Sequence, residues 1–164
     1  MRLLILTIFS FWGLWSCSST RAPDDLNKPP VSFEKSATDK GSYIAALAYS
    51  LVGTPYVYGG DSPQQGFDCS GLVFYTHGLA GDKVARTSYS QLASSQSVGL
   101  QELTPGDLLF YRINGKPSHV AIYIGDRRFI HAPSSGKKVS IGSMDNPYFK
   151  ARLIRAGRLY TETQ

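Results

Sequence analysis

Residues 119–131, with the sequence HVAIYIGDRRFIH, contain two short runs of β-branched and aromatic residues on either side of Gly125-Asp126. Such runs favour strands, and a Gly-Asp pair between them favours a tight turn. The stretch therefore predicts an antiparallel hairpin. His119 and His131 stand at its two ends, with Gly125 at the midpoint between them. We therefore expect the two imidazoles to lie opposite each other across the hairpin.

The segments around this hairpin alternate strand-like runs with turn signals. Apolar residues recur at helical spacing over 43–51, before these runs begin. Further helices are expected from Cys69 to about Gly78 and over 88–93, with a loop over 56–66. Helices followed by an antiparallel meander indicate an α+β domain. The expected strands are 107–113, 119–125, 128–131, 138–141 and 152–160.

Length and composition are those of one globular domain with extensions. The chain has 164 residues, of which 42% are hydrophobic and 18% are charged, and this excludes a mainly disordered protein. The net charge of +5 is either that of a solvated basic surface or favours anionic partners such as acidic wall polymers. Because no nucleic-acid-binding motif accompanies the charge, we expect no nucleic-acid partner.

The amino-terminal residues have the pattern of an export signal. A positive start precedes an apolar run over 3–15, which is too short to span a bilayer comfortably. The segment Leu14-Trp15-Ser16-Cys17 resembles the lipobox of bacterial lipoproteins, in which the cysteine receives diacylglycerol. This resemblance implies a signal peptide over 1–16 and a lipid anchor, of the palmitate-bearing lipoprotein kind, on Cys17. The alternatives are an ordinary secretory signal cut elsewhere and an uncleaved anchor.

Serine, proline and charged residues dominate the stretch after the lipobox, and no helical or strand period runs through it. We therefore expect a flexible tether over 17–39 and a folded domain over 40–162. Ser18, directly after the lipobox cysteine, resembles the outer-membrane type of lipoprotein sorting. These features imply a protein anchored in the bacterial cell envelope through its lipid, facing the periplasm at the outer membrane.

Cys69 is a candidate nucleophile because it stands at the expected start of a helix, with Asp68 before it as the N-cap. A helix N-terminus favours a thiolate, so we expect a lowered pKa for the thiol. The free N–H groups there suit an oxyanion. A lone cysteine is more often a buried structural residue. The cysteine count also permits a Cys17–Cys69 disulfide, although lipidation of Cys17 would leave Cys69 as a free thiol.

His119 and His131 supply the polar partners that a thiol nucleophile needs. A base must take the thiol proton and return it to the leaving amine, and we assign this role to His119. His131 can hold the ring of His119 in one tautomer. Each histidine taken alone is more often structural, as we expect for His77, which is either structural or exposed. The positions of Cys69 and the two histidines contain no closely spaced ligand pair, so we expect no metal and no other cofactor.

Six segments resemble, in order, the motifs of the NlpC-type cell-wall peptidase family, a branch of the papain-like cysteine peptidases. The resemblance implies a papain-like fold, in which N-terminal helices pack on a central antiparallel sheet of about five to six strands. The nucleophile then lies at a helix N-terminus. The six segments are 54–60 (TPYVYGG), 67–73 (FDCSGLV), 86–91 (RTSYSQ), 103–110 (LTPGDLLF), 118–125 (SHVAIYIG) and 130–133 (IHAP).

The same resemblance implies a role for each matching residue. Cys69 is the nucleophile, His119 is its base and His131 is the polar third member. Tyr56 points its hydroxyl into the site, near the nucleophile and the oxyanion. Other matching residues near the nucleophile are expected to bind the substrate peptide, including a free amine where one is present. These residues are Asp68, Ser70 and Arg86.

The family cleaves peptide bonds of the bacterial wall, between D-glutamate and diaminopimelate or lysine, or related bonds in cross-links. The resemblance therefore implies a peptidoglycan hydrolase, a cysteine endopeptidase that acts as a monomer on stem or cross-link peptides. The sequence leaves two alternatives open. One is a non-catalytic wall-binding lipoprotein, and the other is an amidase or transacylase on the same scaffold.

Overall fold

The structure is a computed structural model that describes residues 39–113, 115–134 and 137–161. The expected signal peptide, the lipidation site at Cys17 and nearly all of the expected tether lie outside the described residues. Within the described part of the chain, no helix has the length and apolar character that a membrane crossing requires.

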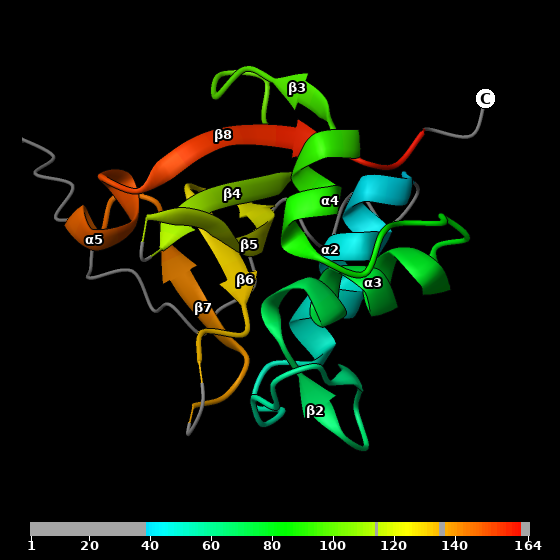
Figure 1. Cartoon of the computed structure of the whole chain (residues 1–164). Helices are drawn as coiled ribbons and strands as arrows, with labels where there is room; N and C mark the ends of the chain where they lie inside the picture. The colour runs from blue at the N-terminus through cyan, green and yellow to red at the C-terminus, as the bar shows by residue number, and fades with distance from the viewer. Residues whose placement is uncertain (1–38, 114, 135–136, 162–164) are drawn as a thin grey trace, which may run out of the picture.

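A six-stranded antiparallel sheet forms the centre of the described domain, and α2 (Lys40–Ser50), α3 (Cys69–Leu79) and α4 (Ser88–Ser94) lie on one side of it (Figure 1). The strand order is β3-β8-β4-β5-β6-β7. This arrangement confirms the predicted α+β class and the central sheet. A further helix is α5 (Pro147–Lys150). The strands of the sheet are β3 (Gln96–Val98), β4 (Leu108–Ile113), β5 (Lys116–Gly125), β6 (Arg128–His131), β7 (Ser140–Ser143) and β8 (Leu153–Arg158).

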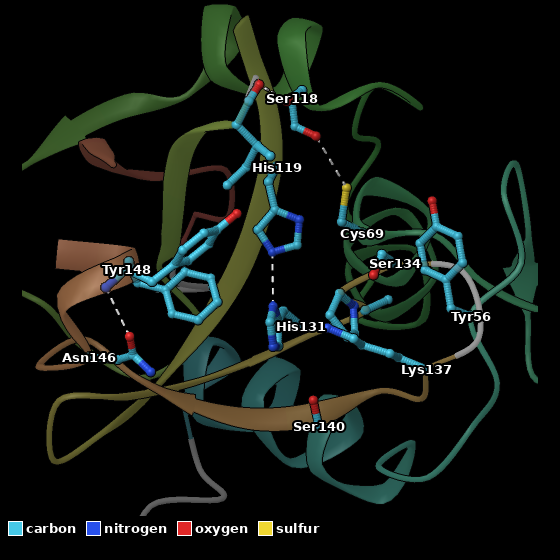
Figure 2. A pocket seen from close by; sticks show the side chains of 14 residues that line it. Tyr56, Cys69, Ser118, His119, His131, Ser134, Lys137, Ser140, Asn146 and Tyr148 are labelled. Atoms are coloured by element: carbon cyan, nitrogen blue, oxygen red, sulfur yellow. Dashed lines mark hydrogen bonds between the residues drawn. The ribbon is translucent and has the colours of Figure 1, made fainter. Parts of the chain in front are cut away.

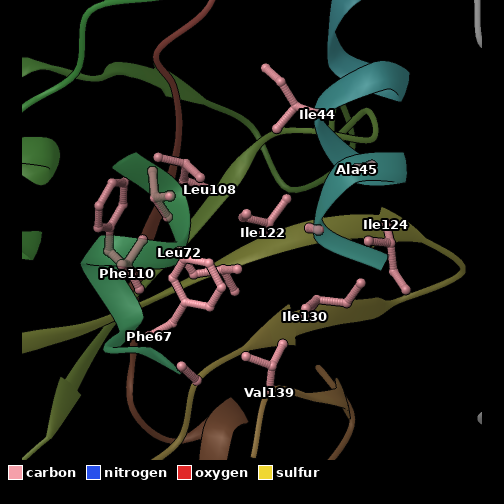
Figure 3. Close-up of a cluster of buried hydrophobic side chains, with 14 of the residues drawn as sticks. Ile44, Ala45, Phe67, Leu72, Leu108, Phe110, Ile122, Ile124, Ile130 and Val139 are labelled. Atoms are coloured by element: carbon pink, nitrogen blue, oxygen red, sulfur yellow. The ribbon is translucent and has the colours of Figure 1, made fainter. Parts of the chain in front are cut away.

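Alternate residues of β4 pack on opposite faces of the sheet, as the two-residue period of a strand requires. Leu108 and Phe110 belong to the larger core, where α2 and α3 cover the sheet (Figure 3). Leu109 and Tyr111 belong to a second core on the other face, against which Phe149 of α5 packs. The sheet is therefore covered on both faces, and α3 contacts β5 on the side of the larger core.

Several short elements escape the sequence prediction. The stretch expected as a loop over 56–66 contains β1 (Asp61–Ser62), and this strand pairs with β2 (Gly66–Phe67). Strand β3 and helix α5 were also not expected. Each of these elements is only a few residues long, so its hydrophobic period cannot be distinguished from that of a loop. A signal for α5 does exist, because Asn146 caps the helix and Pro147 occupies its first turn.

The hairpin of β5 and β6 forms, but its register differs from the predicted one. Gly125 was expected at the pivot, whereas the turn residues are Asp126 and Arg127, both with positive φ (50° and 57°). Ile122 pairs with Ile130, and the register shifts before Gly125. The prediction that the two histidines lie directly opposite is therefore wrong. Because the turn is centred on Asp126 and Arg127 and not on Gly125, the pairing is offset and the histidines take diagonal positions.

Candidate active site

Cys69 is the first residue of α3, which packs against β5. Asp68 caps this helix, accepting a hydrogen bond from the Gly71 amide at 2.6 Å. Cys69 as a whole residue is partly exposed, and its thiol is free of any disulfide. Its Sγ donates to the Ser118 carbonyl oxygen at 3.8 Å. Together, the cap and the packing of α3 on β5 place the sulfur beside β5, near the ring of His119 (Figure 2).

His119 and His131 are hydrogen-bonded to each other through their rings. His119 Nε2 lies 2.9 Å from His131 Nδ1, and the two rings meet nearly at right angles, at 80°. The ring of His119 lies between Cys69 and His131, with its other nitrogen on the side of Cys69 (Figure 2). This order of thiol, imidazole and second imidazole is that of a nucleophile, its base and an orienting group.

Aromatic side chains surround the two imidazoles. Phe149 contacts both rings, with centroids 6.4 Å from His119 and 5.3 Å from His131. Tyr111 and Phe129 contact one imidazole each. This apolar environment lowers the pKa of His119 from 6.5 to about 4 and that of His131 to about 3, because burial disfavours the charged ring. Both imidazoles are therefore neutral near pH 7.

The sequence predicts a lowered pKa for the Cys69 thiol, and this prediction is wrong. Burial raises the pKa of the thiol, and the negative charge of Asp68 raises it further. Backbone amides of Cys69, Ser70 and Val120 act in the opposite direction but do not outweigh burial. Near pH 7 the thiol and His119 are consequently both uncharged.

Tyr56 stands beside Cys69, where the resemblance places it (Figure 2). Its main chain is fixed by a hydrogen bond from the Tyr56 amide to the Lys137 carbonyl at 2.9 Å. Burial raises the pKa of Tyr56, and the nearby Cys69 and Asp68 raise it further. The phenol therefore keeps its proton and has a hydrogen-bond donor to offer in the pocket that it shares with Cys69.

The three residues predicted to bind substrate form one network. Arg86 contacts both oxygens of Asp68, with Nη1 at 2.9 Å from Oδ1 and Nη2 at 3.1 Å from Oδ2. Ser70 Oγ donates to Asp68 Oδ1 at 3.1 Å. The amide of Gly59 donates to Oδ2 at 2.9 Å. Burial alone would raise the pKa of Asp68, but the hydrogen bonds from Arg86 and from the Gly71 amide outweigh it and lower the pKa.

Cys69 lies between two cavities, which share Tyr56, Cys69 and Ser118 in their walls. The first, here called the His131 pocket, has a volume of about 500 Å³ and is also lined by His119, His131, Lys137, Tyr148 and Phe149. The second, here called the Asp68 pocket, has a volume of about 790 Å³ and is also lined by Tyr58, Asp68, Ser70, Arg86, Tyr89 and Lys116. A chain that crosses from one pocket to the other passes along the wall that Tyr56, Cys69 and Ser118 share.

The sequence profile of the NlpC/P60 family matches residues 53–158 of this chain. This match covers the site and most of the described domain. The chain belongs to the NlpC/P60 family. The resemblance drawn from the six segments is thus confirmed.

Relatives and solved structures agree with this assignment. The chain is 36% identical over 115 residues to the murein DD-endopeptidase MepH of Escherichia coli, covering 67% of this chain and 42% of that protein. It is 33% identical over 138 residues to the bifunctional muramidase/DL-endopeptidase CwlT of Bacillus subtilis, and this match covers 82% of this chain and 40% of that protein. It therefore matches less than half the length of these curated relatives. The structure of a protein from Staphylococcus aureus, described as similar to lipoprotein and of the NLP/P60 family, superimposes with a TM-score of 0.67 at 34% identity. The match covers 74% of this chain and 42% of that one. The papain-like fold is confirmed.

Within this NlpC/P60 domain, the predicted site residues that the structure describes all lie in one cleft. Cys69, His119, His131 and Tyr56 line the His131 pocket, and the Asp68 network lines the other. His77 is fully buried in α3, where Nδ1 contacts the Val73 carbonyl at 3.0 Å, so the structural interpretation of His77 is correct. No group of metal-ligating side chains occurs among the described residues.

Sequence reasoning missed several cleft residues of this family member. Lys137 and Tyr148 line the His131 pocket, and Tyr58 and Tyr89 line the Asp68 pocket. These residues lie in loops or on short helices, where a charged or aromatic side chain carries no periodic signal. Tyr58 is 88% exposed in the structure, so it lies outside the core that periodic sequence signals detect.

Proposed function

We propose that this chain is a peptidoglycan hydrolase, a cysteine endopeptidase that cleaves peptides of the bacterial wall. The observation that carries the proposal is the arrangement of Cys69 at the N-terminus of α3 next to the hydrogen-bonded pair of His119 and His131. This arrangement lies in a cleft between two pockets. The names of the relatives as murein and peptidoglycan endopeptidases support the substrate class.

In the proposed mechanism, His119 removes the proton of the Cys69 thiol as the sulfur attacks a peptide carbonyl. His119 Nε2 must then carry the ring proton and donate to His131 Nδ1, which leaves the nitrogen on the Cys69 side as the acceptor. The imidazolium formed protonates the leaving amine. The acyl group stays on Cys69 until a water, activated by the same imidazole, releases it.

The tetrahedral intermediate needs donors near the sulfur. The main-chain N–H groups at the start of α3 have no partners within the helix and point toward its N-terminal end, where Cys69 lies. Backbone amides of Cys69 and Ser70 already favour negative charge on the sulfur. The phenol of Tyr56 adds a side-chain donor. We assign oxyanion stabilisation to these groups.

The direction of the substrate in the cleft follows from the proton path. The leaving amine receives its proton from His119, so the leaving group lies in the His131 pocket and the acyl group in the Asp68 pocket. Lys137 lines the His131 pocket, and its ammonium contributes to the lowered pKa of His131 after burial and His119. None of the described residues that line this pocket is acidic. A leaving group with a carboxylate fits this charge, as diaminopimelate does in a D-glutamyl–diaminopimelate bond.

The cellular setting is a further part of the proposal. The lipobox-like segment ending at Cys17 supports export and lipid anchoring, with a signal peptide over 1–16 and a tether over 17–39. We place the domain over 40–162 as a monomer in the cell envelope, facing the periplasm at the outer membrane. Palmitate labelling of cells that express the chain tests the anchor, because Cys17→Ala should abolish the label.

Digestion of intact sacculi and of isolated muropeptides tests the activity. Mass spectrometry of the products should show new amino and carboxyl termini within the stem or cross-link peptide. Transfer of the acyl group to an amine in place of water would indicate a transacylase. Cleavage of the bond between the sugar and the stem would indicate an amidase. Binding to sacculi with unchanged muropeptides would indicate a wall-binding lipoprotein and contradict the proposal.

A further inference from the structure

The imidazole of His131 has a second nitrogen that the histidine pair does not use. Its Nδ1 lies 2.9 Å from His119 Nε2. Its Nε2 makes no hydrogen bond within the described part of the chain, and it is not one of the buried polar atoms that lack a partner there. Because the ring lines the His131 pocket, Nε2 opens into that pocket, on the side of the ring away from His119 (Figure 2). A ligand in the pocket can therefore bond to His131 directly.

Two arrangements of the protons satisfy the hydrogen bond between the neutral rings. In the first, His119 Nε2 donates to His131 Nδ1, so His131 carries its own proton on Nε2. His119 Nδ1 then presents a lone pair on the side of Cys69. In the second, His131 Nδ1 donates, its Nε2 is bare, and His119 carries its proton on Nδ1. Only the first arrangement can take the proton of the Cys69 thiol, so a proton on His131 Nε2 marks the competent state.

The fixed charge beside His131 favours the second arrangement. Within the described residues, the charge that acts on this ring is the Lys137 ammonium, which lowers the pKa of His131 after burial and the effect of His119. Figure 2 shows the Lys137 side chain extending toward His131. An ammonium has donors and no acceptor, so it suits a bare nitrogen and disfavours an N–H group. None of the described residues that line the pocket is acidic, so no carboxylate of the wall offsets the ammonium.

We propose that a carboxylate on the leaving group binds His131 Nε2–H and the Lys137 ammonium together, and that this contact holds the histidine pair in its competent arrangement. This inference rests on the proposed function and deepens it, because His131 becomes a substrate-binding residue as well as the partner of His119. A leaving residue with a carboxylate then activates the base. An amide accepts the same hydrogen bond but does not neutralise the ammonium, so it favours the competent arrangement less.

The change from the second arrangement to the first conserves protons. One proton leaves His119 Nδ1 for water, and the shared proton passes from His131 Nδ1 to His119 Nε2. One proton from water then reaches His131 Nε2. Both rings begin and end neutral, and water gives as many protons as it receives. The carboxylate supplies no proton, since it only accepts the hydrogen bond from Nε2–H.

Three matched peptides test this inference. They differ in the leaving residue, which is diaminopimelate, diaminopimelate amidated on its side-chain carboxyl, or lysine. Nitrogen NMR of the Cys69→Ala variant, isotopically labelled in its histidines, shows which ring nitrogens carry protons whether or not the wild type cleaves. We expect the protons of the free variant on Nδ1 of both rings. Saturation with the diaminopimelate peptide should move them to Nε2 of both rings, and the lysine peptide should not.

Several NMR results would overturn the inference. They are protons already on Nε2 of both rings in the free variant, no change with the diaminopimelate peptide, the same change with the lysine peptide, and no binding of the diaminopimelate peptide. The expected change in Cys69→Ala, together with no cleavage by the wild type, would reject the hydrolase proposal alone.

Turnover by variants gives a second readout. The wild type should have a kcat about five- to tenfold higher for the diaminopimelate peptide than for its amidated form. His131→Asn keeps an acceptor for His119 but lacks Nε2, so it should lose this difference in kcat and keep the difference in KM that Lys137 provides. Lys137→Ala should raise kcat for the amidated peptide, and the exposed Lys138→Ala should not. Equal kcat values in the wild type, or an undiminished difference in His131→Asn, would contradict the contact with His131.

Discussion

His119 Nε2 and His131 Nδ1 lie 2.9 Å apart although their strand positions are diagonal rather than opposite. The diagonal arises because the turn is centred on Asp126 and Arg127, so that Ile122 pairs with Ile130 and the pairing is offset from one centred on Gly125. On the neighbouring strand β4, Tyr111 is the residue that pairs with His119. The contact between the imidazoles therefore depends on ring orientation within an aromatic shell, and this dependence makes the role of His131 testable.

Substitutions of the two histidines should differ in severity. His119→Ala removes the base, and we expect kcat/KM to fall by about 10²- to 10⁴-fold. His131→Ala should cost less, because the base remains but loses its orienting partner. His131→Asn keeps a polar group at this position and should retain more activity than His131→Ala. Steady-state kinetics on one muropeptide provide the comparison. Wild-type kcat/KM in His131→Ala would show that the ring plays no part.

The pH profile should have an unusually acidic limb. His119 accepts a proton only when neutral, and burial lowers its pKa to about 4. We therefore expect kcat/KM to be lost near pH 4 and not near 6.5, the ordinary pKa of histidine. The thiol, whose pKa is raised by burial, stays protonated through neutral pH. A rise in activity with a midpoint near pH 6.5 would contradict the inference that both imidazoles are neutral near pH 7.

Folding must be monitored across the same profile by circular dichroism. Histidines whose folded-state pKa is lowered contribute stability that is complete above their unfolded pKa of about 6.5. That stability is lost as the pH falls through the folded-state values of about 4 for His119 and about 3 for His131. A profile measured only where the circular dichroism is unchanged separates the ionisation of the base from acid unfolding.

Lys137 should matter for substrates that carry a carboxylate on the leaving group. Lys137→Ala removes the cation of the His131 pocket. Because the side chain is exposed, we expect a modest rise in KM of about two- to fivefold. An amidated leaving group should show no such change. Lys138→Ala is the matched control, since Lys138 is exposed and outside both pocket walls. Equal effects of the two substitutions would exclude a specific contact.

Two glycines of α3 form a matched pair for stability. A Cβ on Gly71 would lie 2.1 Å from the Gly60 carbonyl oxygen, whereas a Cβ on Gly78 would meet nothing within 4 Å. Gly71→Ala should destabilise the fold by about 1–3 kcal/mol and displace the helix start that carries Cys69. Gly78→Ala should stabilise it by about 0.5–1 kcal/mol, because alanine favours a helix interior. Chemical denaturation measures the free energy of unfolding of both variants. Similar changes in the two would contradict the close approach of Gly71 to the Gly60 carbonyl.

The elements with strong local signals could be predicted from the sequence. Helix α3 was found from the apolar residues after Cys69, and Asp68 does cap it through the Gly71 amide. Strands β4, β5, β6 and β8 were found from their β-branched and aromatic runs to within a few residues. Both signals act over neighbouring residues, so they do not depend on the rest of the fold.

The features that depend on distant packing could not be predicted. The pKa of Cys69 was expected to be lowered by its helix, but burial, which involves segments far along the chain, raises it. The register of the hairpin depends on Asp126 and Arg127 adopting positive φ, which neither residue type requires. Lys137 enters the cleft through its main-chain bond to Tyr56, a pairing with no local pattern.

The most direct measurement is turnover of a purified muropeptide by the wild type and by Cys69→Ala, with new termini identified by mass spectrometry. Cys69 lies at the surface end of α3 and is partly exposed, so the variant should keep the fold and the unfolding midpoint of the wild type. We predict new peptide termini with the wild type and none with the variant. Undiminished cleavage by a folded Cys69→Ala protein would contradict the account.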